Sequence, residues 1–292
     1  MRNHVIFAIV LAVVAVFAAE IGVWEKSMNL DMNFSMSNFS DNWAGGDAGA
    51  LNWVANSDML AQKQINEWFH WKNTLKLSFG QTHSQDVASK KWRVPEKSND
   101  LIEFESMSRF TLGAFVDPYA AVRLESQFLD GRVTANKRVF NPIKLTESAG
   151  VARVIFKNEH RELTSRLGFG VRQNIDRDVM IAPEDFETQT SNDGGLEWVS
   201  ELRMPLADNR INYTSKLVVF NALFSSEAEA REGTPEADYW KAPDVNWENR
   251  FSAKITEHLT VNLQIQLLYD KEIDLKGRHK ETLSLGLNYN LF

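Results

Sequence analysis

Apolar and polar residues alternate near the C-terminal end of this chain, and this period-two pattern constrains the fold more than any other feature. In residues 259–269 the odd positions are Leu, Val, Ile or Tyr, while Thr, Asn and Gln occupy the even positions up to 266. Residues 283–291 repeat the alternation with Ser, Gly and Asn between the apolar positions. Successive side chains of a strand point to opposite faces, so both segments predict strands with one apolar and one polar face.

Similar segments recur through the rest of the chain, and none after the N-terminus has convincing helical periodicity. The other predicted strands lie near residues 28–40, 49–60, 68–82, 101–112, 119–129, 148–157, 163–171, 196–204, 213–223 and 245–255. With the two C-terminal strands the total is about twelve, and bacterial single-chain membrane barrels have an even number of strands. The sequence therefore predicts an all-β fold, a closed antiparallel transmembrane β-barrel of about 12 strands with an N-terminal signal peptide.

The connections between these strands alternate in length. The long, polar ones are 83–99, 130–146, 176–193, 225–243 and 270–280, and the short ones lie around 117–118, 158–160, 207–209 and 256–258. With the N-terminus in the periplasm, the long connections face outward, as in outer-membrane barrels. The alternative is a soluble barrel or sandwich with an apolar core, but a β-sandwich has no reason to alternate its loop lengths.

Both ends of the chain carry features of export. An apolar run from Val5 to Ala19 follows a short start containing Arg2 and is followed by acidic Glu20, which predicts a signal peptide at 1–19 and an outer-membrane β-barrel at 20–292. The alternative is an anchor helix, but the run is short for a bilayer. The terminal Phe292 resembles the signal recognised by the barrel-assembly machinery. We therefore expect the bacterial outer membrane as location, with its lipid and that machinery as partners.

Composition excludes several classes of function. The net charge is −7 and no basic block stands out, so nucleic acid is not an expected partner. The chain has no Cys, and no Gly-x-Ser-x-Gly, His-Glu-x-x-His or phosphate-loop motif is found. We expect no catalytic residue, no metal and no cofactor. His70 is the one histidine expected on a strand, on the lumen side and beside no obvious Ser, which disfavours a lipase-like barrel hydrolase.

The face assigned to the lumen is rich in charge. Its predicted lining residues are Glu103, Glu105, Arg109, Arg123, Glu125, Arg153, Arg166, Arg172, Glu197, Glu201, Arg203, Glu248, Arg250 and Lys254. Two interpretations follow: these rows form a path for a small polar solute, or they pair across the lumen and fill it. The mixed signs argue against a strongly ion-selective filter.

A short motif carries a family resemblance. Asn42-Trp43-Ala44-Gly45-Gly46 precedes an apolar strand, followed by aromatic residues from Trp68 and a polar stretch from Lys97. This order resembles an uncharacterised bacterial outer-membrane β-barrel family, domain of unknown function family 3078, frequent among Bacteroidota-like organisms, over residues 35–175. The resemblance implies a barrel and no activity. In the loop motif Asn42, Trp43, Gly45 and Gly46, the glycines permit a tight turn and Trp can cover the barrel mouth.

These observations favour an outer-membrane β-barrel that is a passive channel or binding barrel for a small polar solute. One alternative is a closed structural or surface-interaction barrel that acts through the extracellular loops 83–99, 176–193 and 225–243. Another is the membrane-embedded hydrolase. A continuous wet lumen favours the first, a salt-bridged closed lumen the second, and a Ser–His pair within hydrogen-bond reach the third.

Overall fold

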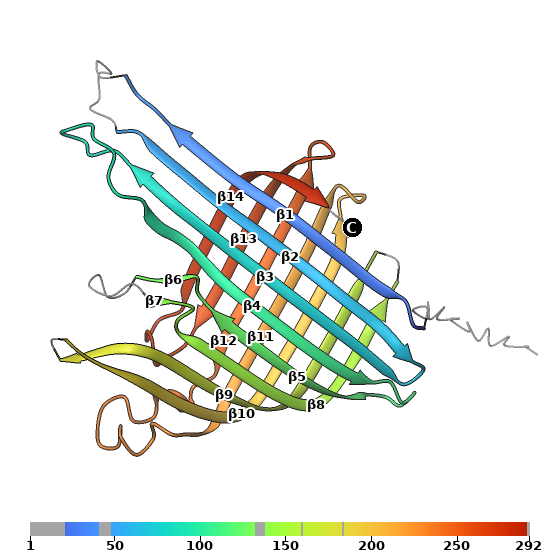
Figure 1. Cartoon of the computed structure of the whole chain (residues 1–292). Helices are drawn as coiled ribbons and strands as arrows, with labels where there is room; N and C mark the ends of the chain where they lie inside the picture. Colours follow the sequence, from blue (N-terminus) through green and yellow to red (C-terminus); the bar gives the residue numbers. More distant parts are fainter. Residues whose placement is uncertain (1–20, 41–47, 132–137, 159, 183, 291–292) are drawn as a thin grey trace, which may run out of the picture.

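Twelve antiparallel strands close into one barrel in the computed structural model, which describes residues 21–40, 48–131, 138–158, 160–182 and 184–290 (Figure 1). The barrel strands are β1 Trp24–Ser37, β2 Ala50–Asn66, β3 Phe69–Ser84, β4 Glu96–Phe110, β5 Asp117–Ser126, β8 Ile143–Lys157, β9 Glu162–Ala182, β10 Asp185–Leu206, β11 Ile211–Ser225, β12 Asp244–Lys254, β13 Leu259–Tyr269 and β14 Arg278–Asn290. Each pairs with its neighbours in chain order, and β1 closes on β14. The predicted closed antiparallel barrel of about 12 strands is confirmed.

Two small elements lie outside the barrel wall. The strands β6 Leu129–Asp130 and β7 Arg138–Val139 form a separate two-stranded sheet, and η1 Tyr239–Lys241 is a single 3-10 turn. In the described part of the chain, no helix has the length and apolar character needed to cross a membrane.

The connections have the predicted asymmetry, with one difference. Short turns such as 207–210 and 255–258 join strands at the end where β1 begins, and longer connections such as 85–95 and 226–243 lie at the opposite end. The segment 176–193 was predicted to be a loop and is mostly strand, because β9 and β10 continue their pairing to Ala182 and Asp185. This hairpin projects from the barrel in Figure 1. Its charged residues 176–178, apolar residues 179–182 and polar residues 187–193 stand in consecutive runs, so the segment lacks the alternation that marks a strand with one apolar face.

Burial is inverted relative to a soluble protein. The outward Leu283 on β14 is 72% exposed, whereas the inward Asn262 on the adjacent β13 is 1% exposed. On β1 the outward Met32 and Phe34 are exposed while the inward Asp31 is buried. An apolar exterior around a polar interior is the arrangement of a barrel surrounded by lipid, and a soluble barrel with an apolar core would show the reverse. The chain is therefore a membrane-spanning β-barrel of the outer-membrane type.

Three outward tryptophans satisfy their polar groups within the wall. The indole N–H donates to a serine hydroxyl on the next strand in the pairs Trp71–Ser106 at 2.9 Å, Trp198–Ser165 at 2.8 Å and Trp247–Ser215 at 2.9 Å. In each pair, the serine lies two positions along the neighbouring strand from the residue that is directly opposite the tryptophan. A polar group left unpaired against hydrocarbon costs free energy, so these bonds adapt the wall to lipid.

Candidate functional site

Thirteen of the fourteen residues predicted to line the lumen point into the barrel. Each is buried, lines an internal cavity or, in the case of Glu125, forms an ion pair with the buried Arg123. The thirteen are Glu103, Glu105, Arg109, Arg123, Glu125, Arg166, Arg172, Glu197, Glu201, Arg203, Glu248, Arg250 and Lys254. The period-two rule places them because one strand face turns inward along its whole length. They do not form one uniform ring. They separate into a packed cluster on one side of the lumen and a cavity wall on the other.

Arg153 differs from the prediction and lies on the outer wall. It is exposed, and its guanidinium carbon is 3.7 Å from the centre of the Phe115 ring, on the short connection before β5. The inward positions of β8 are instead held by small side chains such as Ser148 and Ala152, which are buried. A cation over an aromatic face at the edge of the barrel is favourable. The pairing of β8 is regular from Ile143 to Val154, so Arg153 shares the outward parity of the exposed Val151.

The packed side of the lumen is an ion cluster of two arginines and two glutamates. Arg166 donates to both carboxylate oxygens of Glu105, at 3.0 and 2.5 Å, and Arg123 donates to Glu197 at 2.5 Å. Arg123 also lies 3.4 Å from Glu105. All four side chains are at most 5% exposed. Buried charges require such compensation, because each one has lost its hydration.

Glycines let the wall close around this cluster. Gly150 of β8 and Gly168 of β9 are cross-strand partners. A Cβ at Gly168 would lie 2.4 Å from the backbone oxygen of Ala149 and 2.6 Å from the hydroxyl oxygen of Tyr119. The inward Tyr119 packs with Met107, Ala121 and Ala152 in a small apolar cluster. This side of the lumen is therefore filled by side chains.

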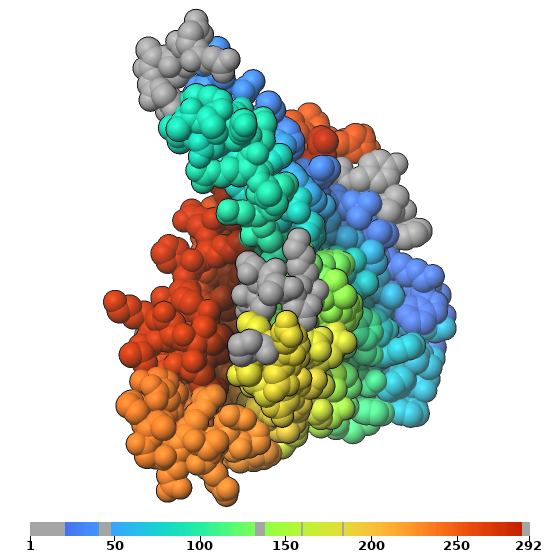
Figure 2. Space-filling view, turned by 60° about the vertical axis from the view of Figure 1, so that its left-hand side comes forward, coloured from blue at the N-terminus to red at the C-terminus, as the bar shows by residue number. Residues whose placement is uncertain are grey.

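The other side of the lumen holds a cavity of about 740 Å³. Its wall extends from Asn209 and Arg210, on the short turn after β10, to Asn99 and Lys280, near the long connections. Much of the wall is uncharged and polar, with Ser, Thr, Asn and Gln side chains from many strands. Figure 2, in which the long-loop end comes forward, shows a hollow between the red C-terminal strands and the yellow β9–β10 hairpin. The cavity thus spans much of the barrel length.

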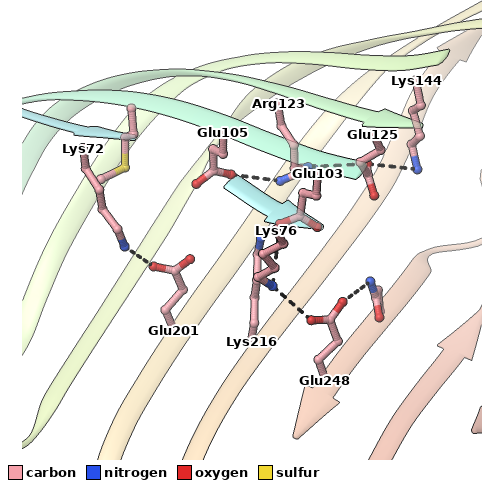
Figure 3. Close-up of polar contacts among 12 residues, drawn as sticks. Lys72, Lys76, Glu103, Glu105, Arg123, Glu125, Lys144, Glu201, Lys216 and Glu248 are labelled. Carbon is pink, nitrogen blue, oxygen red and sulfur yellow. Dashed lines mark hydrogen bonds and ion pairs between the residues drawn. The ribbon is translucent and has the colours of Figure 1, made fainter. Parts of the chain in front are cut away.

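A set of ion pairs lies inside the lumen beside this cavity, and we call it the lumen belt. The pairs are Lys72–Glu201 at 2.8 Å, Lys76–Glu248 at 3.2 Å, Lys76–Glu103 at 3.7 Å, Lys216–Glu103 at 2.7 Å, Arg250–Asp58 at 3.1 Å and Arg250–Asp31 at 3.7 Å. Figure 3 shows Lys72 directed at Glu201 and Lys76 directed at Glu248. The pairs Lys72–Glu201 and Lys76–Glu248 connect β3 with β10 and β12, so they narrow the lumen between opposite walls. Lys76 and Glu103, in contrast, are opposite each other on the adjacent strands β3 and β4.

Sequence reasoning missed five members of the belt. They are Asp31, Asp58, Lys72, Lys76 and Lys216. The sequence pattern could have identified Lys72 and Lys76 of β3. Both are an even number of residues from His70, which was expected to face the lumen, whereas the apolar Leu75 falls on the opposite face. Their partners lie far away in the sequence, and only closure of the barrel identifies them.

His70 faces inward, as its parity predicted. It is 9% exposed and borders a second, small cavity of about 30 Å³ together with Arg109, Lys72 and Glu162. No serine lines that cavity. In the described residues there is also no group of three or more His, Cys, Asp or Glu that could hold a metal.

The outer connections carry local order of their own. In the β3–β4 connection, the backbone N–H of Ser89 and the Arg93 guanidinium, which donates at 2.7 Å, hold the pKa of Asp86 below its usual value. This turn is held by its own side chains. The loop motif Asn42, Trp43, Gly45 and Gly46, the predicted signal peptide 1–19 and Phe292 lie outside the described residues and stay predictions.

The first part of the barrel has relatives by sequence. Residues 34–131 match the family described as Protein of unknown function (DUF3078). This match confirms the resemblance to domain of unknown function family 3078 over about a third of the chain. It adds no activity. A comparison with curated proteins gives no match.

Several solved structures resemble the barrel as a whole. The COG4313 outer membrane channel from Pseudomonas putida F1 is 14% identical, with 94% of this chain and 96% of that chain covered and a TM-score of 0.39. The translocator domain of the autotransporter NalP from Neisseria meningitidis is 9% identical, with coverage of 90% and 86% and a TM-score of 0.38. OprB from Pseudomonas putida is 11% identical, with coverage of 92% and 94% and a TM-score of 0.31. All three TM-scores are below 0.5, so the functional inference rests on this barrel's own residues.

Proposed function

We propose that this protein is an outer-membrane barrel whose lumen passes or holds a small polar solute. One observation carries the proposal: a polar cavity of about 740 Å³ reaches from a short turn to the vicinity of the long loops. A barrel needed only as a membrane anchor gains nothing from such a space, and a side-chain-filled lumen would be more stable. Its wall of hydroxyls, amides and paired charges suits a hydrated solute.

The lumen belt favours a second candidate, a closed barrel that acts through its outer loops. Lys72 and Lys76 reach Glu201 and Glu248 on the far wall, and these contacts reduce the free cross-section. The hydrolase alternative has less support, because no serine lines the His70 cavity.

Single-channel conductance of the refolded protein in a planar bilayer separates the two candidates. Only material with heat-modifiable gel migration is used, which ensures a folded barrel. Discrete, reproducible current steps support the conduit. Silence from folded, inserted protein refutes it and favours the closed barrel.

A charge-neutralised pair tests whether the belt limits the pathway. The double variant Lys76→Gln, Glu248→Gln removes a cross-lumen pair without leaving either charge alone, and we expect its conductance to rise. Glu103 keeps Lys216 as a partner at 2.7 Å, so the neighbouring pair stays intact. Arg153→Gln, on the outer wall, is the control and should leave the conductance unchanged. An unaltered conductance in the double variant would show that the belt lies outside the conducting path.

A further inference from the structure

The wall of the large cavity carries more cations than anions, although the whole chain has a net charge of −7. Eight Lys or Arg side chains line it against four acids, Asp58, Glu162, Glu201 and Glu248. Asp31 and Glu103 contact belt cations without lining the cavity, and when they are counted an excess of two positive charges remains. The sign of the lumen is thus opposite to that of the chain.

Three of the lining cations have no acidic partner among the described residues: Arg210, Lys254 and Lys280. Arg210 precedes Ile211, whose cross-strand partner is Ala253, so Arg210 and Lys254 lie next to each other where β11 and β12 meet the short turns. Lys280 lies near the long connections and donates to the amide oxygen of Asn99 at 2.6 Å, a neutral acceptor. Unpaired positive charge is therefore found at both ends of the cavity.

The four acids that line the cavity all have cationic partners. Glu162 lies 3.6 Å from Arg203 and also 3.6 Å from Lys157. Asp208 and Glu257, in the turns beside Arg210 and Lys254, are exposed and do not line the cavity. Glu25, at the start of β1, does not line it either and accepts a hydrogen bond from Gln62. The belt between the two ends pairs its cations with acids. Among the charged side chains that line the cavity, the ones without a partner of opposite sign among the described residues are therefore all positive, and they lie at its two ends.

We propose that the lumen prefers small anions over cations, with Arg210 and Lys254 attracting them at the short-turn end and Lys280 at the other. This inference rests on the proposed conduit. Fixed charge in a narrow cleft concentrates ions of opposite sign, and the effect extends over a Debye length of about 10 Å in 0.1 M salt. Guanidinium and ammonium groups bind carboxylate and phosphate oxygens by charge-assisted hydrogen bonds, so small carboxylates and phosphates are the solutes that fit.

The test is the reversal potential of the refolded full-length barrel under a KCl gradient, with chloride and potassium as the probe ions. A unit charge acting at about 4 Å in water is worth about 1 kcal/mol before screening, so we expect chloride to be favoured by about two- to fivefold. The double variant Arg210→Gln, Lys254→Gln should bring the permeability ratio close to one. Arg153→Gln removes a cation from the outer wall at the same end and should leave the ratio unchanged. Heat-modifiable migration verifies that each variant folds.

The outcomes separate the inference from the proposed function. Chloride preference that falls in the double variant and persists in Arg153→Gln supports the inference. Conductance without preference, or with preference for potassium, overturns the inference and leaves the conduit standing. Chloride preference that is unchanged in the double variant Arg210→Gln, Lys254→Gln overturns the assignment to these two residues. No conductance from folded wild-type protein overturns the conduit, and the inference with it.

Discussion

Arg123 and Glu197 offer a test of how the packed side of the lumen is stabilised. Glu197 is fully buried and accepts from Arg123 at 2.5 Å. Arg123 contacts two further carboxylates, Glu105 at 3.4 Å and Glu125 at 3.5 Å. The pair is therefore asymmetric, because the arginine contacts three carboxylates while the glutamate has one arginine as its ion-pair partner.

This asymmetry sets the expected magnitudes. Arg123→Met leaves Glu197 buried without its cation and should lower the free energy of unfolding by about 3–5 kcal/mol. Glu197→Gln keeps the shape and leaves Arg123 with two other carboxylates, so we expect a loss of about 1–3 kcal/mol. In the Arg123→Met background, Glu197→Gln removes an uncompensated charge. There the same substitution should stabilise the barrel.

The assay is equilibrium unfolding by urea or guanidinium of barrels refolded into phospholipid vesicles, followed by tryptophan fluorescence. The four proteins of the double-mutant cycle are compared at equal lipid content, and Arg153→Met serves as an exposed control expected to change stability by less than about 1 kcal/mol. If Glu197→Gln destabilises both backgrounds equally, within about 0.5 kcal/mol, the two residues are uncoupled and the reasoning is refuted.

Two further predictions concern the barrel wall. Trp198→Phe and Ser165→Ala should each lower the free energy of unfolding by about 0.5–1.5 kcal/mol. The double variant should lose less than the sum of the two, because both substitutions remove the same hydrogen bond. Additive losses in vesicle unfolding would contradict this. Gly168→Ala should lower the free energy of unfolding by about 1–3 kcal/mol, because its Cβ would lie 2.4 Å from the backbone oxygen of Ala149. Gly170→Ala on the same strand is the matched control, since the nearest atom to its Cβ would be 3.5 Å away. Equal unfolding midpoints for the two glycine variants would contradict the close approach.

Period two predicted the strands well where one face meets lipid and the other the lumen. The strands β13 and β14 are the clearest case, because hydrocarbon requires apolar side chains on the outer face alone. The rule failed in 176–193, where apolar and polar residues stand in consecutive runs and do not alternate. At Arg153 the alternation itself holds, but a charged side chain takes an outward position, so charge alone did not identify the lumen face.

The ion pairs could not be predicted from the sequence, for a different reason. Lys72 and Glu201 are separated by 129 positions, and Lys76 and Glu248 by 172. Which strands face each other across the lumen depends on strand number and stagger after closure. Parity therefore identified most inward residues, but it did not distinguish the packed cluster from the cavity wall.

The contact between β1 and β14 has a consequence for assembly. Every other junction of the barrel joins strands that are consecutive along the chain, apart from the small β6–β7 excursion, whereas this one joins the two ends of the sheet. In the described residues it consists of five pairs, from Asn29 with Asn290 to Asn33 with Gly286, against fourteen pairs between β1 and β2. A sheet of successive hairpins can therefore form before this junction does, and until then it has two unsatisfied edges in a medium without water. Closure is the step at which those edges disappear, and it is the step most in need of a partner that shields them.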